Sequence, residues 1–511
     1  MSNEPVLSPL GQDAPSAAPA RAVSRRSALR LAGAGGLLAA GGALLTGCGD
    51  DAATGSTSTD PSTAPSSASA APSTGSAKVA AVDLPLVTPA GHAPSSRRAT
   101  WSQQFQADHG WSAAGAGTAS SEANDTSMFI TGSQSVRVTT DGSGRQSYVR
   151  RVGMPKMDLT GKMIRLTFRV EDVTHLSKLA FYLGTGTLAN NFHWQFHNHS
   201  ATAANYVQSG EWVVVHLQWA DVAAAAGSYD LSPVGVPSTT SGFTDMSFAA
   251  YDNAGGPVTF HLQAIELLPD TRTTFSKGVV SITFDDSYAS VYNLALPAMK
   301  AHGFAGTMYN IAQAAGTSNY LTLDQMRSLQ DSSGWEMGGH AFSTAAHNSG
   351  YNQLTSQQVD TDMGQLRDWL NANKFSNEHF AYPHGSFQQT SDGIPVDRIA
   401  SRYFSTARSI IYETVESFVP AMPYRLKALT GLNDGTGTGG EGLAEVTGQG
   451  AKLDRCAQSG DWLILCFHEL VAGAPSSSTQ ISQAGFTKVM EAIASRGMPV
   501  VTVAEAMKHY S

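Results

Sequence analysis

The chain has 511 residues, which is longer than the roughly 250 to 300 residues that a single hydrophobic core usually serves. We therefore expect two folded domains with tails or linkers. Hydrophobic residues make up 41% and charged residues 14%, as in globular proteins, while 50 glycines and abundant alanine and serine indicate long linkers. The net charge of −9, without clustered Lys and Arg, argues against nucleic acid as a partner.

The first 48 residues have the pattern of an export signal. The stretch "SRRSALR" at 24–30 is a twin-arginine signal, and a Gly/Ala-rich apolar stretch follows at 31–45. That stretch is shorter than the ~20 residues that a membrane-spanning helix needs. It ends in "LTGC" at 45–48, which resembles the lipobox of bacterial lipoproteins. The resemblance implies acylation of Cys48 and an exported, extracytoplasmic protein anchored to the cell membrane by lipid. The alternative is a plain cleaved signal and a secreted protein.

Residues 49–94 consist mostly of Ser, Thr, Ala, Pro and Gly, with hardly any large apolar side chain. Such a segment cannot bury enough apolar surface to offset the conformational entropy that it would lose on ordering. We therefore predict a disordered linker, which would hold the following domains away from a membrane surface.

The cysteines at positions 456 and 466 raise the question of a disulfide, because an exported protein permits one. Cys466 lies in the middle of the apolar run "WLILCF", which reads as a buried strand. We therefore predict that Cys456 and Cys466 are buried free thiols, with a disulfide as the alternative.

Between about 95 and 270, short segments of alternating polar and apolar residues are separated by turn residues. Examples are "QSVRVTT", "MIRLTFRV", "KLAFYLGTG", "EWVVVHLQW" and "VTFHLQAIEL". Period-two alternation at this spacing predicts an all-β sandwich. This strand pattern resembles that of the jelly-roll modules that accompany carbohydrate-active enzymes. We therefore expect an accessory domain at 95–270, with carbohydrate binding as one function open to it.

Within this region, "NFHWQFHNH" at 191–199 places histidines 193, 197 and 199 on one face of a strand. The aromatic residues Phe192, Trp194 and Phe196 fall on the opposite face, as they do in a strand that packs on a core. A polar outer face is the favoured interpretation, and a glycan-binding or metal-binding surface is the alternative.

After about residue 275 the pattern changes to strands alternating with helices. Apolar, β-rich runs occur at "GVVSITF", "FAGTMYN", "HFAYP", "YFSTA", "WLILCF" and "PVVTV". Capping boxes mark helix starts at Thr322 with Gln325 and at Thr355 with Gln358. After the second, apolar residues at 359, 363, 366 and 370 recur at helical spacing. Alternating β and α predicts a parallel sheet or barrel with chemistry at the C-terminal ends of the strands.

Polar motifs follow several of these predicted strands. They are "TFDD" at 283–286, "EMGGHAFSTAAHN" at 336–348, "FAYPHGS" at 380–386 and "LILCFHE" at 463–469. An isolated pair of aspartates after a strand usually starts a turn. The ordered set, in contrast, resembles the polysaccharide deacetylases, the family-four carbohydrate esterases, over about 275–511. This resemblance implies a distorted (β/α) barrel and a divalent metal, usually Zn²⁺, held by one Asp and two His. It also implies removal of N-acetyl groups from amino sugars, or of O-acetyl groups in some members.

Carried over position by position, the resemblance assigns Asp286, His340 and His347 to the metal and makes Asp285 the general base. Adjacent residues of a strand point to opposite faces, so both aspartates can serve one site only where the strand ends and its backbone turns. A base beside a zinc-bound water, acidified towards a pKa of ~7, would generate hydroxide at neutral pH.

Four further residues receive roles from the same resemblance. His468 would be the general acid that protonates the departing amine. The backbone N–H of His384 would help to stabilise the oxyanion. Leu465 would line the slot for the acetyl methyl group, and Tyr382 would belong to the substrate-binding segment.

The chain departs from the family pattern at the second metal histidine. The family places its two histidines four positions apart, but Thr344 stands four after His340, and His347 stands seven after it. Seven residues of a continuous helix span ~10.5 Å, which is too far for joint ligation with Zn–N bonds of about 2.1 Å. We therefore expect Ala345 and Ala346 to loop out if His347 is the ligand. The alternative is a two-ligand or metal-free site.

Two other departures concern the catalytic groups. Ala381 stands where many members carry an arginine that orients the base, and Arg408 could supply that charge from the next strand end. The usual Asp-Trp partner of the catalytic histidine is not found. The G-x-G-x-x-G in "GTGTGG" at 435–440 has no strand before it and is read as a flexible loop.

The leading hypothesis is thus a metal-dependent hydrolase that removes N-acetyl groups from a polysaccharide outside the cytoplasm. Peptidoglycan, poly-N-acetylglucosamine and chitin-like polymers are the candidate substrates. One alternative is an acetyl ester hydrolase on O-acetylated polysaccharide. Another is a non-catalytic glycan-binding lipoprotein with a decayed site. The sequence indicates no protein partner.

Overall fold

The computed structural model describes residues 99–197, 206–217, 231–234, 241–270, 275–410, 416, 420–434 and 442–509. The predicted export signal with Cys48, the predicted linker at 49–94 and the glycine-rich stretch at 435–440 lie outside these residues. Within the described part of the chain, no helix has the length and apolar character needed to cross a membrane.

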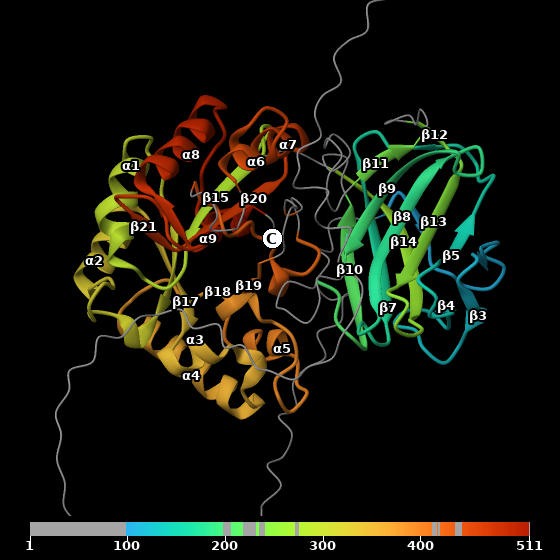
Figure 1. The fold of residues 1–511 in the computed structure, drawn as a ribbon, viewed down its shortest axis with the longest axis horizontal. Coiled ribbons are helices and arrows are strands. Elements are labelled where there is room, and N and C mark those ends of the chain that lie inside the picture. The colour runs from blue at the N-terminus through green and yellow to red at the C-terminus, as the bar shows by residue number, and fades with distance from the viewer. Residues whose placement is uncertain are drawn as a thin grey trace, which may run out of the picture. The chain divides into compact units, whose positions relative to one another are not determined.

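The region between residues 101 and 269 is built from antiparallel strands (Figure 1). One six-stranded sheet has the order β10-β7-β14-β4-β3, with β1 beside β14, and the other has the order β11-β9-β8-β13-β5-β2. The first comprises β1 (Trp101–Gln103), β3 (Thr118–Asp125), β4 (Ser135–Thr140), β7 (Lys162–Val170), β10 (Glu211–Leu217) and β14 (Thr259–Pro269). The second comprises β2 (Ser112–Ala114), β5 (Gln146–Arg151), β8 (Leu176–Thr185), β9 (Asn190–His197), β11 (Leu231–Val234) and β13 (Asp245–Asp252). A short pair joins β6 (Met157–Asp158) to β12 (Ser241–Phe243).

These two sheets share one hydrophobic core. Phe168 of β7 and Phe248 of β13 come from different sheets, and their ring centroids lie 5.1 Å apart. The predicted alternation is confirmed in β9, where Phe192 and Trp194 are buried while His193 is half-buried and stacks on Tyr182. The side chain of residue 197 and all of residue 199 lie outside the described part, so the alternative surface at this strand stays a prediction. The jelly-roll topology and the domain boundaries also stay predictions.

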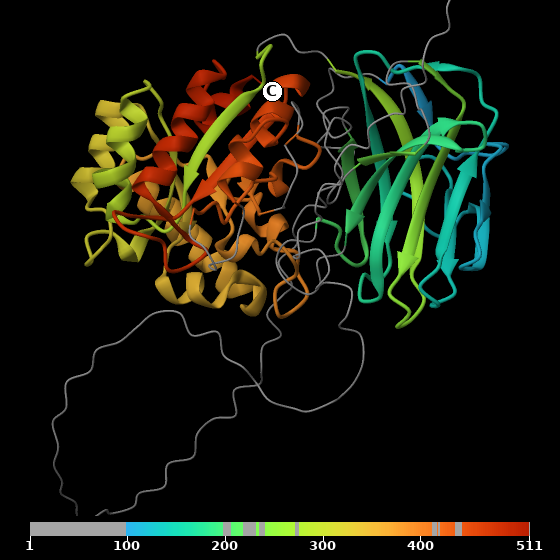
Figure 2. The same ribbon diagram turned by 45° about the horizontal axis from the view of Figure 1, so that its top comes forward.

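The region from residue 279 to 508 contains a parallel sheet with the order β19-β18-β17-β16-β15-β20. Its strands are β15 (Val279–Phe284), β16 (Thr307–Ile311), β17 (Glu336–Ala341), β18 (His379–Ala381), β19 (Thr406–Arg408) and β20 (Trp462–Phe467). Strands β15 and β20 lie side by side in both views (Figures 1 and 2). A separate parallel pair is formed by β21 (Glu469–Val471) and β22 (Gln480–Ser482). The prediction of alternating strands and helices is confirmed here.

Helices connect these strands. They are α1 (Leu296–Lys300), α2 (Leu323–Arg327), α3 (Thr344–Ser349), α4 (Ser356–Ala372), α5 (Val396–Ala400), α6 (Leu443–Thr447), α7 (Lys452–Ser459), α8 (Gln483–Ser495) and α9 (Val503–Lys508). Both predicted capping boxes are present, at Thr322 with Gln325 and at Thr355 with Gln358. The predicted apolar positions of α4 are all buried, so its packing face is the one that helical spacing indicates.

The two edges of the parallel sheet are linked by residues 426–429. Leu426 forms a parallel bridge with Arg408 of β19, and Leu429 forms one with Leu465 of β20. A complete (β/α) barrel nevertheless stays a prediction. One strand prediction was wrong: "PVVTV" makes only an isolated bridge, between Val500 and Val280, because the chain enters α9 directly after it.

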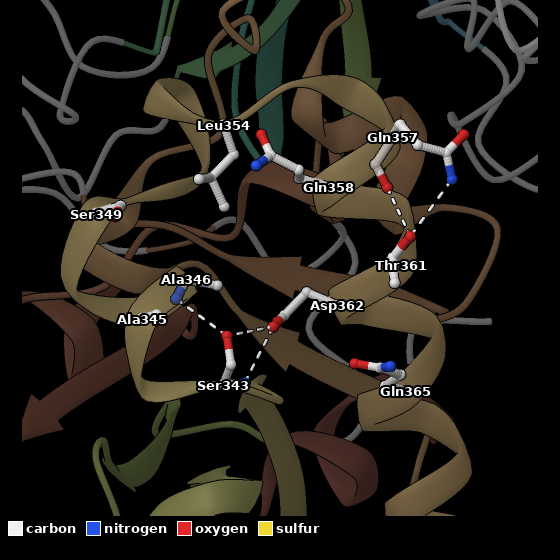
Figure 3. Close-up of a pocket in the computed structure, with 10 residues that line it drawn as sticks. All are labelled: Ser343, Ala345, Ala346, Ser349, Leu354, Gln357, Gln358, Thr361, Asp362 and Gln365. Atoms are coloured by element: carbon white, nitrogen blue, oxygen red, sulfur yellow. Dashed lines mark hydrogen bonds between the residues drawn. The ribbon is translucent and has the colours of Figure 1, made fainter. Parts of the chain in front are cut away.

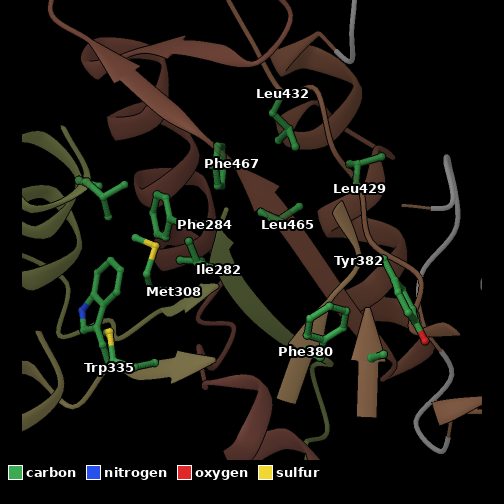
Figure 4. Close-up of a cluster of buried hydrophobic side chains, with 14 of the residues drawn as sticks. Ile282, Phe284, Met308, Trp335, Phe380, Tyr382, Leu429, Leu432, Leu465 and Phe467 are labelled. Atoms are coloured by element: carbon green, nitrogen blue, oxygen red, sulfur yellow. The ribbon is translucent and has the colours of Figure 1, made fainter. Parts of the chain in front are cut away.

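The core of this region gathers buried side chains from strands β15, β16, β18 and β20 (Figure 4). Phe284 at the end of β15 packs against Trp335, Phe467 and Phe486, with ring centroids between 5.3 and 5.8 Å apart. Phe486 brings α8 against the sheet. The aromatic packing therefore fixes the place where β15 ends and the polar residues begin.

Both cysteines of this region are buried and free, which confirms the prediction of free thiols. The Cys456 Sγ donates to the Asp461 carbonyl at 3.2 Å. Burial of each thiol raises its pKa, so both remain protonated at neutral pH.

Candidate metal centre and catalytic site

The paired aspartates stand where strand β15 turns. The backbone N–H of Asp285 still donates to the Phe467 carbonyl at 2.9 Å, as the ladder with β20 requires. Asp286 and Ser287 then adopt φ values of +70° and +68°, a left-handed conformation that residues with side chains rarely take. The buried Ser287 hydroxyl holds the turn by donating to Asn310 Oδ1 at 3.0 Å. The alternation of the strand ends here, so adjacent carboxylates reach the same site, as predicted.

Asp286, His340 and His347 come together from three elements. His340 stands near the end of β17, and His347 lies in α3. The Asp286 Oδ1 is 3.4 Å from His340 Nε2 and 3.0 Å from His347 Nε2. One ligand atom from each of the three residues lies within 4.8 Å of the others. The predicted trio therefore forms a group that could hold a metal ion.

The hydrogen bonds of the two imidazoles leave their Nε2 atoms as acceptors. His340 Nδ1 lies 2.7 Å from the Ala381 carbonyl, which can only accept, so Nδ1 carries the proton. His347 Nδ1 lies 3.0 Å from Asn348 Oδ1 and is protonated in the same way. Asp286 Oδ1, which faces both Nε2 atoms, is buried and makes no hydrogen bond of its own. Three lone pairs thus converge on one place, and this donor set fits a divalent cation.

The electrostatics of the trio agree with this geometry. Burial opposes ionisation of Asp286, but the two imidazoles outweigh it and hold the pKa of this carboxyl well below its usual range. Burial also opposes protonation of His347, and the Asp286 carboxylate outweighs it, so the pKa of His347 is raised. A cation bound between them would take the place of a proton on His347 Nε2, since a histidine ligates a metal only in its neutral form.

The prediction that a looped-out insertion brings His347 to the site was wrong. Ala345 and Ala346 do not loop out, because both belong to helix α3, which Ser343 caps by accepting the Ala346 N–H at 3.0 Å. The distance argument assumed a continuous helix from His340 to His347. His340 is in fact on a strand, and the turn after it lets α3 fold back over the strand end.

Close packing explains why glycine occupies the two positions before His340. A Cβ at Gly338 would lie 2.8 Å from the His379 carbonyl oxygen, and one at Gly339 would lie 2.7 Å from a methyl carbon of Leu366. Strand β17 therefore approaches β18 and α4 more closely than larger residues would allow. This close approach sets the position of His340.

Arg408 pairs with Asp285, as the sequence had suggested. Its Nη2 lies 2.7 Å from Asp285 Oδ1 and 2.5 Å from Oδ2, and both side chains are buried. Burial opposes ionisation of Asp285, but Arg408, with the imidazoles of His340 and His468, outweighs it and lowers the pKa of Asp285. The carboxylate is therefore ionised at neutral pH and can accept a proton.

Cys466 is a neighbour of Asp285 that sequence reasoning missed. Its Sγ donates to Asp285 Oδ2 at 3.4 Å, and the His468 Nε2 lies 3.9 Å from the same oxygen. Asp285, Cys466 and His468 also offer ligand atoms within 4.8 Å of one another. The Arg408 cation already occupies both oxygens of Asp285, and burial keeps the thiol protonated, so this group does not suit a metal. The contact depends on the register of β15 with β20, which no local sequence signal reveals.

Comparison with known proteins agrees with the motif assignment. Residues 272–394 match the family model described as polysaccharide deacetylase. The chain is 28% identical over 144 residues to "Putative polysaccharide deacetylase YxkH" of Bacillus subtilis (strain 168). That match covers 27% of this chain and 48% of the relative, so the chain spans about half the length of the curated protein it matches. Residues 272–394 are therefore similar to polysaccharide deacetylases.

Solved structures also resemble this chain, at low similarity. A family 4 acetyl xylan esterase from Clostridium thermocellum with a cobalt ion is 16% identical, covers 45% of this chain and 90% of its own, and has a TM-score of 0.29. A family 4 carbohydrate esterase from Streptomyces lividans with acetate is 18% identical, covers 44% and 91%, and has a TM-score of 0.26.

The other predicted site residues include His384, which contacts helix α3. His384 is exposed, has φ of 56°, and its Nε2 donates to the His347 carbonyl at 2.9 Å. It therefore touches the helix that carries a candidate ligand. Partial desolvation of its ring and the nearby imidazoles of His347 and His340 lower the pKa of His384. The role of its backbone N–H stays a prediction.

Tyr382 and Leu465 are core residues in this structure (Figure 4). The Tyr382 side chain is buried, and its hydroxyl donates to the Tyr424 carbonyl at 3.0 Å. Leu465 is fully buried between neighbouring strands. The assignment of the Tyr382 side chain to substrate binding therefore needs correction, because this side chain is buried in the core and its hydroxyl is already bonded. A slot for the acetyl methyl group beside Leu465 stays a prediction.

Proposed function

We propose that this protein is a metal-dependent hydrolase that removes N-acetyl groups from an amino-sugar polysaccharide. The observation that carries the proposal is the convergence of three lone pairs, from Asp286, His340 and His347, beside the ionised carboxylate of Asp285. One carboxylate and two imidazoles are a donor set that suits Zn²⁺. When bound, a divalent ion would supply a Lewis acid that polarises the acetyl carbonyl.

The chain's own residues supply the proton transfers. Asp285 accepts a proton from the water that attacks the acetyl carbon, and Arg408 keeps its carboxylate in place and ionised. His468 donates a proton to the amide nitrogen as the carbon–nitrogen bond breaks. The products are acetate and a free amine on the sugar. The distance of 3.9 Å between His468 Nε2 and Asp285 Oδ2 supports a shared site for the proposed acid and base.

The proposed place of action is outside the cytoplasm. The twin-arginine stretch at 24–30 and the lipobox ending in Cys48 support export and a lipid anchor in the membrane. Peptidoglycan, poly-N-acetylglucosamine and chitin-like polymers are N-acetylated glycans found there. The strands between residues 101 and 269 would then form an accessory domain, held with the deacetylase domain on a long linker.

Acetate release from N-acetylglucosamine oligomers tests the activity. Wild-type protein supplied with Zn²⁺ is expected to release acetate, and Asp285→Asn is expected to lower kcat by ~10²- to 10⁴-fold, as loss of a general base does. The matched control is Asp324→Asn, since the Asp324 side chain is 95% exposed on α2. Full activity of Asp285→Asn would remove the proposed base. An inactive, metal-free wild type would favour a glycan-binding protein.

The same assay separates amides from esters. O-acetylated xylan oligomers are compared at equal concentration with the N-acetylated ones. Faster release from the N-acetylated substrate is expected under the proposal. Release only from the O-acetylated substrate would reassign the protein as an acetyl ester hydrolase.

A further inference from the structure

Helix α3, which carries His347, is too short to be stable by itself. It spans Thr344–Ser349, and isolated helices shorter than ~12 to 15 residues are marginal in water. A metal ligand needs a position fixed to within a fraction of an ångström. Other parts of the fold must therefore hold α3 in place.

The side of α3 that faces helix α4 is not closely packed. A cavity of about 360 Å³ lies between the two helices (Figure 3). Ala345, Ala346 and Ser349 line it from α3, and Gln357, Thr361 and Gln365 line it from α4. Apolar packing across this gap is slight, so polar contacts must fix the helix there.

The carboxylate of Asp362 holds the N-terminal end of α3 (Figure 3). It accepts the backbone N–H of Phe342 at 2.9 Å and that of Ser343 at 3.0 Å. It also accepts the Ser343 hydroxyl at 2.9 Å. That hydroxyl in turn accepts the N–H of Ala346, so the group that caps α3 is oriented by Asp362.

The same carboxylate also holds the C-terminal end of α3. Tyr351, two residues after the helix, donates its hydroxyl to Asp362 Oδ2 at 2.7 Å. Tyr351 is fully buried, and its ring stacks on Phe380 of β18 with centroids 6.0 Å apart. One buried carboxylate thus accepts hydrogen bonds from both sides of the helix that bears His347.

Asp362 is itself attached to a rigid element. It lies in the middle of α4, which is 17 residues long. The neighbouring residues Met363 and Leu366 are buried in the core of the deacetylase domain. The position of the carboxylate is therefore determined by core packing, independently of α3.

We infer that Asp362 is a positioning residue for the metal centre: it clamps both ends of α3 and so places the His347 imidazole opposite Asp286. This inference rests on the proposed metal site. In this chain His347 comes seven positions after His340 and stands on a separate helix. The hydrogen bonds of Asp362 therefore fix a ligand that strand β17 does not itself position. Asp362 touches no ligand and no substrate, and it acts through Ser343 and Tyr351.

The test compares the Zn²⁺ affinity of three forms of the full-length protein by competition with a chromophoric chelator. In Asp362→Asn, an amide NH₂ replaces one of the oxygens that accept N–H and O–H groups. The Kd for Zn²⁺ is expected to rise by ~10- to 100-fold, the usual effect of losing a partner behind a metal ligand. The matched control, Asp360→Asn, is on the same helix. This substitution removes the charge that Arg402 contacts at 2.6 Å and Tyr403 at 2.7 Å, and the Kd is expected to stay at the wild-type value.

A second variant tests the inference even if Asp362→Asn does not fold. Tyr351→Phe removes only the hydroxyl bond to Asp362, keeps the stacked ring, and is expected to raise the Kd for Zn²⁺ several-fold while the protein stays folded. A folded Asp362→Asn with wild-type Kd would overturn the inference and leave the metal centre intact. If Asp362→Asn does not fold, an unchanged Kd in Tyr351→Phe overturns it. A wild type that binds no Zn²⁺ would overturn both the metal centre and the role of Asp362.

Discussion

Arg408 and Asp285 form a fully buried ion pair that joins the edge strand β19 to the end of β15. Arg408 Nη2 reaches both carboxylate oxygens, at 2.7 and 2.5 Å. The Tyr309 ring lies beneath the guanidinium, with its centroid 5.2 Å from Cζ. A buried pair of this kind is costly to break, because removal of one partner leaves an uncompensated charge. Ala381 stands where the family resemblance predicts an arginine, and Arg408 of the neighbouring strand β19 contacts the proposed base instead.

Replacement of Arg408 is expected to change the pH dependence of activity. The guanidinium lowers the pKa of Asp285, so Arg408→Gln should raise that pKa. A general base works only when ionised, and the acid limb of the kcat/KM profile should therefore move to higher pH. Arg402→Gln, which alters a partly exposed pair with Asp360, is the control and should leave the limb in place. An acid limb that stays at the wild-type pH in Arg408→Gln would contradict this account.

Metal binding is expected to stabilise the folded protein. An ion that binds only the folded state adds about 2.7 kcal/mol at a concentration 100 times its Kd. Addition of Zn²⁺ to chelator-treated protein should therefore raise the Tm, and His340→Ala should abolish the rise. His302→Ala serves as the control, because that histidine stacks on Phe304 away from the trio. An equal rise of Tm in His340→Ala would place the stabilising ion elsewhere.

The two buried thiols are expected to be unreactive in the folded state. Burial raises the pKa of Cys456 and of Cys466, and only the thiolate is an effective nucleophile. A Cys48→Ser protein should therefore give no colour with a disulfide reagent until denaturant is added, and then two thiols per chain should react. Rapid labelling of the native protein would show that Cys466 is more accessible than its contact with Asp285 implies.

The Tyr382 hydroxyl is expected to contribute to stability and not to substrate affinity. Tyr382→Phe removes a buried hydrogen bond to the Tyr424 carbonyl, which should lower the free energy of unfolding by about 1 kcal/mol. The KM for N-acetylglucosamine oligomers should not change, because the side chain is buried in the core. Urea unfolding and steady-state kinetics on the same samples separate the two effects. A raised KM at unchanged stability would restore the original assignment of this side chain to the substrate.

The architecture of the region from residue 279 to 508 was largely predictable from sequence. Strand β15 and helix α4 appeared as an apolar run and as apolar residues at helical spacing, and both capping boxes formed. These features are local, because the period of side-chain directions and the bonds of a helix start involve only near neighbours in the chain. The strand predicted at "PVVTV" failed because β-rich composition does not specify a pairing partner along the whole segment.

The site was predictable only in part. The motifs named Asp286, His340 and His347, but the expected bulge at Ala345 and Ala346 was wrong because local spacing cannot show a change from strand to helix. By itself the sequence determined which residue types stand at the strand ends. Only the tertiary structure decided that Cys466 and Arg408 meet Asp285, and that Asp362 clamps α3, because contacts between residues distant in the chain depend on strand register and helix packing.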